Sequence, residues 1–209
     1  MLYDMQYRAG SLLLILLVLA AGCTTPADSP GSLATPAAVS IVPTTEKPQA
    51  SVTVSEMALG LADLPSDYIL RDRSVMTTPD VTQLTRDMGW QQGYFVTFDR
   101  TGRIKSDQTR IRQSVYVFPL ENIRRVFSLE KIAFEGTESM MASPYEIPFP
   151  VIGENSIAYR MTDTPEPGQV TYTVLFTRKN VFERITMSGT STDYETLKEI
   201  AGAAAEKIR

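Results

Sequence analysis

A short apolar run, followed by the only cysteine of the 209-residue chain, constrains its organisation most. The stretch from Leu12 to Ala21 is shorter than the roughly 20 residues that a helix needs to cross a bilayer. It falls within the range of about 7–15 residues typical of the apolar region of an export signal, and small residues precede Cys23 as they do at a cleavage site. We therefore expect residues 1–22 to be a signal peptide and the mature chain to begin at Cys23.

The residues around this cysteine, Leu19-Ala20-Ala21-Gly22-Cys23, resemble the lipobox of bacterial and archaeal lipoproteins. The resemblance implies that Cys23 carries a lipid, which would anchor the protein to a membrane on its extracytoplasmic side, at the cell surface or facing a periplasm. An uncleaved N-terminal anchor, or a buried helix that contains a cysteine by chance, is the alternative interpretation.

A segment rich in Thr, Ser, Ala and Pro follows the cysteine. Its low apolar content cannot offset the entropy of ordering, so residues 23–55 are predicted to be a disordered tether. The composition fits both a spacer that crosses a surface layer and an inert linker. Residues 56–209 are long enough for one hydrophobic core and are predicted to be a single globular domain.

Apolar periodicity predicts an α+β fold for this domain, with an antiparallel sheet of about five to six strands and three helices packed on it. Strands are expected over residues 68–73, 94–98, 110–118, 156–161, 169–177 and 181–188. Helices are expected over residues 78–89, 119–134 and 193–209. Thr78-Pro79-Asp80 and the capping box Thr192-Asp193-Tyr194-Glu195 supply two of the helix starts, and Asp99–Gly102 supplies the turn of the first hairpin.

The last two strands carry the most specific pattern. If Lys179-Asn180 forms a two-residue turn, Val174 faces Ile185, so apolar residues meet across the ladder. In the same register Thr173 faces Thr186 on the opposite side of the sheet. The agreement of both faces supports this register.

Residues 60–209 are similar to small uncharacterised lipoproteins with a PsbP-like α/β/α sandwich. The similarity rests on Leu64-Pro65-Ser66-Asp67-Tyr68, on Val151-Ile152-Gly153-Glu154-Asn155-Ser156, and on the closing hairpin and helix. Proteins of that fold are largely binding or assembly accessories, so the resemblance implies an accessory role and identifies no catalytic residue.

Missing residue types restrict the chemistry that this chain can perform. The sequence has no histidine, which removes Ser-His-Asp and Cys-His catalysis and histidine-based metal sites. We therefore expect no cofactor, no metal and no enzymatic activity. The remaining enzymatic alternative is a hydrolase that uses carboxylates near residues 136–150, where Glu135, Glu138, Glu146 and Glu154 gather. Ser128 and Lys131 match S-x-x-K, but the other penicillin-binding-protein motifs do not follow.

Two segments are candidate contact surfaces. The irregular stretch 136–150 is rich in proline and in large apolar residues, which indicates either a lid over a small-molecule pocket or an extended cover on the core. Its candidate contact residues are Met140, Met141, Tyr145 and Phe149.

The second candidate surface is a basic face around the first hairpin, formed by Arg100, Arg103, Lys105, Arg110 and Arg112. Such a face suits an envelope protein, anionic lipid head groups or an acidic surface polymer, although charges on exposed strands also prevent edge-to-edge pairing. The net charge of −4 argues against nucleic acid as a partner. A non-enzymatic binding or accessory module is the function that the sequence favours, and its oligomeric state stays open.

Overall fold

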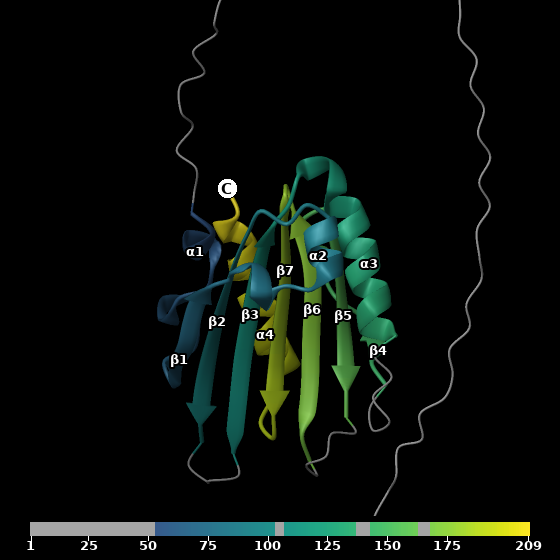
Figure 1. The fold of residues 1–209 in the computed structure, drawn as a ribbon. Helices are drawn as coiled ribbons and strands as arrows, with labels where there is room; N and C mark the ends of the chain where they lie inside the picture. The colour runs from purple at the N-terminus through teal and green to yellow at the C-terminus, as the bar shows by residue number, and fades with distance from the viewer. Residues whose placement is uncertain (1–52, 103–106, 137–142, 163–167) are drawn as a thin grey trace, which may run out of the picture. The chain divides into compact units, whose positions relative to one another are not determined.

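Seven antiparallel strands form one sheet in the computed structural model, in the order β1-β2-β3-β7-β6-β5-β4 (Figure 1). The structure describes residues 53–102, 107–136, 143–162 and 168–209, so most of the proposed tether and all of the signal lie outside the described residues. The strands are β1 (Tyr68–Val75), β2 (Gln92–Thr101), β3 (Gln108–Val117), β4 (Tyr145–Ile147), β5 (Asn155–Met161), β6 (Val170–Arg178) and β7 (Val181–Gly189). The α+β class is as expected, but the sheet has more strands than the predicted five to six.

The additional strand is β4, which lies at the edge of the sheet and pairs only with β5 in the described part of the chain. It has three residues between Pro144 and Pro148. Proline has no N–H to donate to a ladder, so a strand flanked by prolines is suited to an edge. Three residues are too few to show an alternating pattern, which is why the sequence did not reveal this strand.

The predicted register of the closing hairpin is confirmed. Val174 pairs with Ile185 and Thr173 pairs with Thr186, and the two threonine hydroxyls lie 3.2 Å apart. Lys179, in the turn between β6 and β7, has a left-handed backbone conformation with a φ of 54°. In the first hairpin, the predicted turn at Asp99–Gly102 is wrong, because β2 continues to Thr101 and Asp99 pairs with Arg110 inside the ladder.

Helices cover both faces of the sheet, α2 and α3 in front of it and α4 behind it in the view of Figure 1. The α-helices are α1 (Val54–Met57), α2 (Gln83–Asp87), α3 (Ile123–Glu135) and α4 (Tyr194–Lys207), and short 3₁₀ turns occupy Leu61–Asp63, Thr78–Asp80 and Leu120–Asn122. In the described residues, no helix is both long enough and apolar enough to cross a membrane.

Two of the predicted helix starts need correction. Thr78-Pro79-Asp80 forms only a 3₁₀ turn, and α2 begins after Thr82, whose hydroxyl accepts a hydrogen bond of 3.1 Å from the backbone N–H of Thr85. In α4 the capping residue is Asp193, one position after the predicted Thr192, because the Asp193 carboxylate accepts from the N–H of Glu195. Both helices therefore begin at a polar capping side chain, but at a residue later in the chain than the predicted one.

Each face of the sheet has its own apolar core. The core under α4 contains Phe98, Ile111 and Ile185 from the strands, and Ala201 and Ala204 from the helix. The small alanine side chains let α4 lie close to the sheet.

The core under α2 and α3 is smaller. It is built around Phe118, Val126, Tyr159 and Phe182. Leu120 lies within the helix expected over residues 119–134, but it is 64 % exposed because it belongs to the 3₁₀ turn before α3.

The end of the β3–β7 ladder provides a stability test at a glycine. Gly189 has a φ of +145°, and a Cβ added there would lie 2.0 Å from the backbone oxygen of Gln108 on β3. We expect Gly189→Ala to lower the free energy of unfolding by about 2–4 kcal/mol, since both strain and a backbone clash result. Denaturant titration followed by circular dichroism measures the change.

Gly202→Ala in α4 is the matched control, because a Cβ there meets no atom within 4 Å. This variant should be neutral or more stable by about 0.5–1 kcal/mol, since alanine loses less backbone entropy than glycine in a helix. Equal destabilisation by the two substitutions would contradict the tight β3–β7 contact.

Candidate functional site

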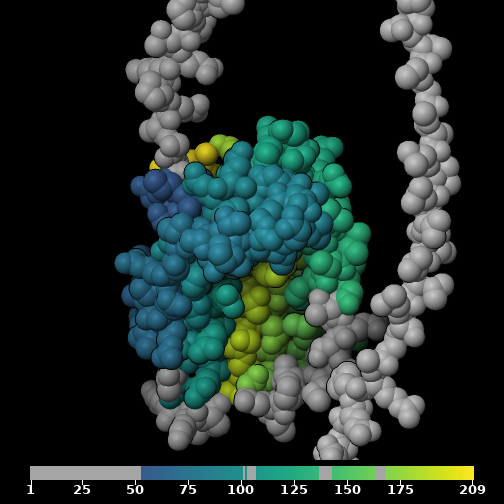
Figure 2. Space-filling model, in the orientation of Figure 1, coloured from purple at the N-terminus to yellow at the C-terminus, as the bar shows by residue number. Residues whose placement is uncertain are grey.

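Part of the sheet face that carries α2 and α3 is left uncovered. Figure 2 shows this area as a hollow below α2, where the strands themselves form the surface. The hollow follows β3 and β7, and we call it the sheet-face groove. It is lined by Arg110, Arg112, Ser114, Tyr116, Arg184, Thr186 and Ser188.

The antiparallel register of β3 and β7 arranges the polar lining of the groove into three cross-strand pairs, which we call rungs. Arg110 pairs with Ser188, Arg112 with Thr186, and Ser114 with Arg184. Each rung therefore places one guanidinium beside one hydroxyl. Because residues two apart on a strand share a face, successive rungs are separated by about 7 Å.

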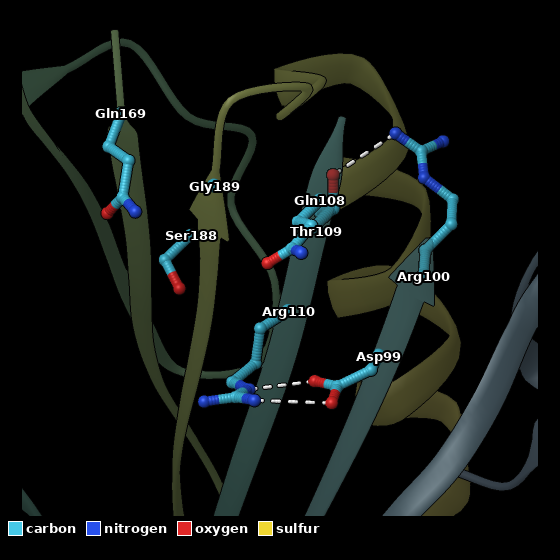
Figure 3. A pocket seen from close by; sticks show the side chains of 8 residues that line it. All are labelled: Asp99, Arg100, Gln108, Thr109, Arg110, Gln169, Ser188 and Gly189. Atoms are coloured by element: carbon cyan, nitrogen blue, oxygen red, sulfur yellow. Dashed lines mark hydrogen bonds and ion pairs between the residues drawn. The ribbon is translucent and has the colours of Figure 1, made fainter. Parts of the chain in front are cut away.

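The groove continues beyond both ends of the three rungs. At its open end it merges, through Arg110 and Ser188, with a hollow of about 380 Å³ that Asp99 and Gln169 also line (Figure 3). At its other end, Tyr116 and Arg184 are shared with a hollow beneath α2 and α3. These shared residues connect the three hollows, of which the one beneath α2 and α3 is lined in part by the apolar Val81, Leu84 and Phe134.

Carboxylates hold two of the three groove arginines in place. Arg110 donates from Nε and Nη2 to the two Asp99 oxygens, at 2.7 and 3.2 Å (Figure 3). This hydrogen bonding, together with the charge of Arg110 and of Arg71 at 3.8 Å, holds the pKa of Asp99 below its usual range although partial burial acts in the opposite direction. Arg184 donates from Nη2 to Glu130 of α3 at 2.5 Å.

Arg112, in the middle rung, has no carboxylate partner among the described residues. Its side chain is exposed, and its guanidinium carbon lies 5.6 Å from the centre of the Phe95 ring. A cation–π contact of this kind orients the guanidinium without using its N–H donors. Arg112 is therefore the groove arginine with the most donors available to a ligand.

The structure divides the predicted basic face. Arg110 and Arg112 lie in the groove, whereas Arg100 points to the opposite face, where it donates to the Ser191 carbonyl at 2.7 Å and lies over the Tyr68 ring. This division follows from strand alternation. Arg103 and Lys105 lie outside the described residues.

The sequence did not reveal that β7 supplies half of the groove. Arg184, Thr186 and Ser188 alternate with Ile185 and Met187, so the only signal in the sequence was that they occupy the polar face of a strand. Pairing of β7 with β3 brings them to the groove across about 70 residues of chain.

The candidate contact residues of stretch 136–150 are dispersed. Tyr145 begins β4, is 49 % exposed, and its hydroxyl accepts a hydrogen bond of 3.2 Å from Arg160. Phe149 packs against the core under α4. Met140 and Met141 lie outside the described residues, as does Cys23.

The loop carboxylates that were considered for catalysis take part in other contacts. Glu135 accepts a hydrogen bond of 2.8 Å from the Tyr159 hydroxyl, and burial and this bond raise the pKa of Tyr159. Glu146 lies 3.8 Å from Lys131, and Glu154 accepts from the N–H of Lys179. Glu138 is not described. Over the ranges that the structure describes, no group of three or more His, Cys, Asp or Glu residues is arranged to hold a metal ion.

Comparison with known proteins identifies the fold but no family. No protein-family model matches the chain, and no curated protein matches it. Among solved structures, the chain is similar to the extracellular domain of PknH from Mycobacterium tuberculosis, with a TM-score of 0.54 at 9 % sequence identity. The match covers 74 % of this chain and 94 % of that domain.

A second solved structure, an uncharacterized protein of Mycobacterium smegmatis that is the ortholog of Rv0999, matches with a TM-score of 0.43 at 10 % identity. That match covers 75 % of this chain and 96 % of the other chain.

A buried carboxyl lies on the other face of the sheet. Glu183 of β7 is fully buried and accepts a hydrogen bond of 2.7 Å from Gln113 Nε2, while Gln113 Oε1 accepts from the N–H of Leu59. The second Glu183 oxygen has no partner among the described residues. Burial raises the pKa of Glu183 to about 8, against opposing effects of Gln113 and Lys207. Its signal in the sequence was a carboxylate on the inward face, between Val181 and Ile185.

Glu183 should make the stability of the fold depend on pH. In the folded state the carboxyl keeps its proton up to about pH 8, whereas an ordinary glutamate loses it near pH 4.5. Folding therefore takes up a proton at Glu183 in this window, so the contribution of Glu183 to stability is greatest below pH 4.5, falls as pH rises, and levels off above about 8. Each unit of pKa difference corresponds to about 1.4 kcal/mol. Urea titrations at several pH values measure the slope.

Glu183→Gln should remove this dependence, because glutamine keeps the oxygen that accepts from Gln113 and does not ionise. Glu199→Gln, at an exposed position of α4, is the matched control and should keep the wild-type slope. If Glu183→Gln also kept that slope, the buried carboxyl would not be its source.

Proposed function

We propose that the protein is a lipid-anchored extracytoplasmic lipoprotein whose domain is a non-enzymatic binding or accessory module, and that the sheet-face groove is its binding surface. The observation that carries the proposal is the set of three guanidinium–hydroxyl rungs on the uncovered part of one sheet face. Arginine and hydroxyl groups are donors, and donors lined up in a groove are suited to hold an acidic partner.

Two observations support the extracytoplasmic location. The apolar run before Cys23 has the length and the small residues of an export signal with a lipid attachment site. The fold also resembles a domain that is extracellular in PknH. A lipid on Cys23 would hold the domain at the membrane, with the residues between Cys23 and the start of α1 at Val54 as the tether.

The chemistry of the groove supports binding without turnover. Its nearest carboxylates, Asp99 and Glu130, each form an ion pair with a groove arginine. Arg110 holds the pKa of Asp99 below its usual range, which makes this carboxylate a weak general base. The sequence has no histidine to take that role.

A small-molecule site beside β4 is the second candidate function. A hollow of about 500 Å³ lies along Glu146–Phe149, next to Ser156 and Ile157. The end of the predicted lid stretch 136–150 would then form a wall of the hollow, because Tyr145–Ile147 is strand β4 of the sheet.

The lipid anchor is tested in membranes of cells that express the full chain. We expect the Cys23 peptide to carry a diacylglyceryl modification by mass spectrometry, and the protein to partition into the detergent phase of Triton X-114. Cys23→Ser should lose the modification and move to the aqueous phase. An unmodified Cys23, or residues 1–22 still attached to the mature chain, would contradict the proposal.

The binding surface is tested by photo-crosslinking on the same membranes. A photoreactive residue in place of Ser188, in the groove, should give an adduct of one defined mass. The same residue in place of Arg125, on the exposed side of α3, should not. Adducts of equal yield at both positions, or none at Ser188, would remove the groove as the binding surface.

A further inference from the structure

We infer that the sheet-face groove binds a linear ligand with successive phosphate groups separated by short organic linkers, one phosphate to each rung. The inference rests on the proposed function and adds the chemical class of the ligand. Its basis is the repeated pairing of a guanidinium with a hydroxyl along β3 and β7.

The spacing of the rungs selects a chain with regularly repeated anions. Arg110, Arg112 and Arg184 belong to three successive rungs, so their attachment points recur about every 7 Å along the groove. A single anion contacts one rung. Only a ligand with anionic groups at a comparable repeat can contact all three, and directly condensed phosphates repeat too closely for one phosphate to face each rung.

The composition of each rung favours phosphate over carboxylate. Arginine binds either anion through two parallel hydrogen bonds to a pair of oxygens. The acceptor sites of a carboxylate lie in the plane of the group, whereas those of a tetrahedral phosphodiester point out of any single plane. A phosphodiester oxygen that accepts from the guanidinium on one strand is therefore better placed to accept also from the hydroxyl on the other. The second donor is the hydroxyl of each rung. Ser188 and Thr186 supply it in the first two rungs, where Thr186 can accept from Thr173 at 3.2 Å while it donates to the ligand, and Ser114, which is 7 % exposed, supplies it in the third.

The middle rung should contribute most to affinity. Arg112 has no ion pair in the described part of the chain, so its donors are free for the ligand, and Thr186 lies opposite it. Arg110 donates to Asp99 from Nε and Nη2, which leaves Nη1 for a ligand. Arg184 donates to Glu130 from Nη2 alone, and its buried Nε has no partner among the described residues.

The charges around the groove predict modest, salt-sensitive binding. Arg71, next to Asp99, adds a fourth positive charge to those of the three groove arginines. Three carboxylates reduce the positive potential of the groove: Asp99, Glu130 and Asp72. Asp72 pairs with Thr97 and lies on the same face of the sheet. Exposed charges are screened by salt within about 10 Å at 0.1 M ionic strength. Binding should therefore weaken as salt is raised.

The shape of the site argues for a chain and against a bilayer surface. The rungs lie in a hollow that α2 and α3 border (Figure 2). A flat layer of head groups cannot enter such a hollow, but an extended chain can lie along the strands.

The test uses the full-length chain in a non-ionic detergent and a synthetic oligomer of six glycerol phosphate units, in which phosphodiesters alternate with three-carbon linkers. Isothermal titration calorimetry should detect binding that weakens with salt. Arg112→Gln should weaken it about tenfold or more, since hydrogen bonds to charged groups are the strong ones. Thr186→Val should weaken it severalfold, and Arg125→Gln, outside the groove, should not change it. Circular dichroism checks that each variant is folded.

Three outcomes would overturn the inference: no binding of the oligomer, equal affinity of Arg112→Gln and Arg125→Gln, or equal binding of a glutamate hexamer. Preferential binding to phosphatidylglycerol vesicles, insensitive to Arg112→Gln, would indicate a membrane surface instead. The crosslink at Ser188 distinguishes a wrong ligand class from a wrong binding surface. An adduct at Ser188 without oligomer binding removes only the phosphate ligand, whereas absence of the adduct removes the groove as a binding surface.

Discussion

The pairing of β3 with β7 is the interaction on which the rest of the structure depends. It joins two hairpins that are distant in the sequence, through nine residue pairs from Thr109–Gly189 to Val117–Val181. At one end the backbones approach so closely that only glycine fits at position 189. On one face this ladder buries Ile111 and Ile185 under α4, and on the other it forms the groove.

The two faces of the sheet differ because the helices cover them unequally. The α4 face is apolar along most of its length and tolerates the buried Glu183 only with Gln113 as a hydrogen-bond partner. Because α2 has only five residues, part of the other face stays exposed to water. Strand positions there carry arginine, serine and threonine, as expected for a solvated face of an antiparallel sheet. The resulting donors are what a ligand would meet.

Local pattern was sufficient for much of the fold. The register of β6 and β7 could be predicted because a two-residue turn fixes which residues face each other. Helix α4 could be predicted from its apolar stripe, although its cap is Asp193. Strand β4 could not be predicted, because three residues are too few to show the alternation of a strand. For the candidate site, Arg110 and Arg112 were evident as charges on a strand, but Arg184 was not, since nothing local shows which strand β7 pairs with.

The sequence by itself determined the hairpins, the apolar stripes and the apolar run before Cys23, because each depends on residues close together in the chain. Only the tertiary structure decided that β7 lies between β3 and β6, that Arg100 and Arg110 point to opposite faces, and that three arginines meet three hydroxyls. The physical reason is that pairing between distant strands is selected by the packing of the whole core, whereas turns and periodicity act over a few residues.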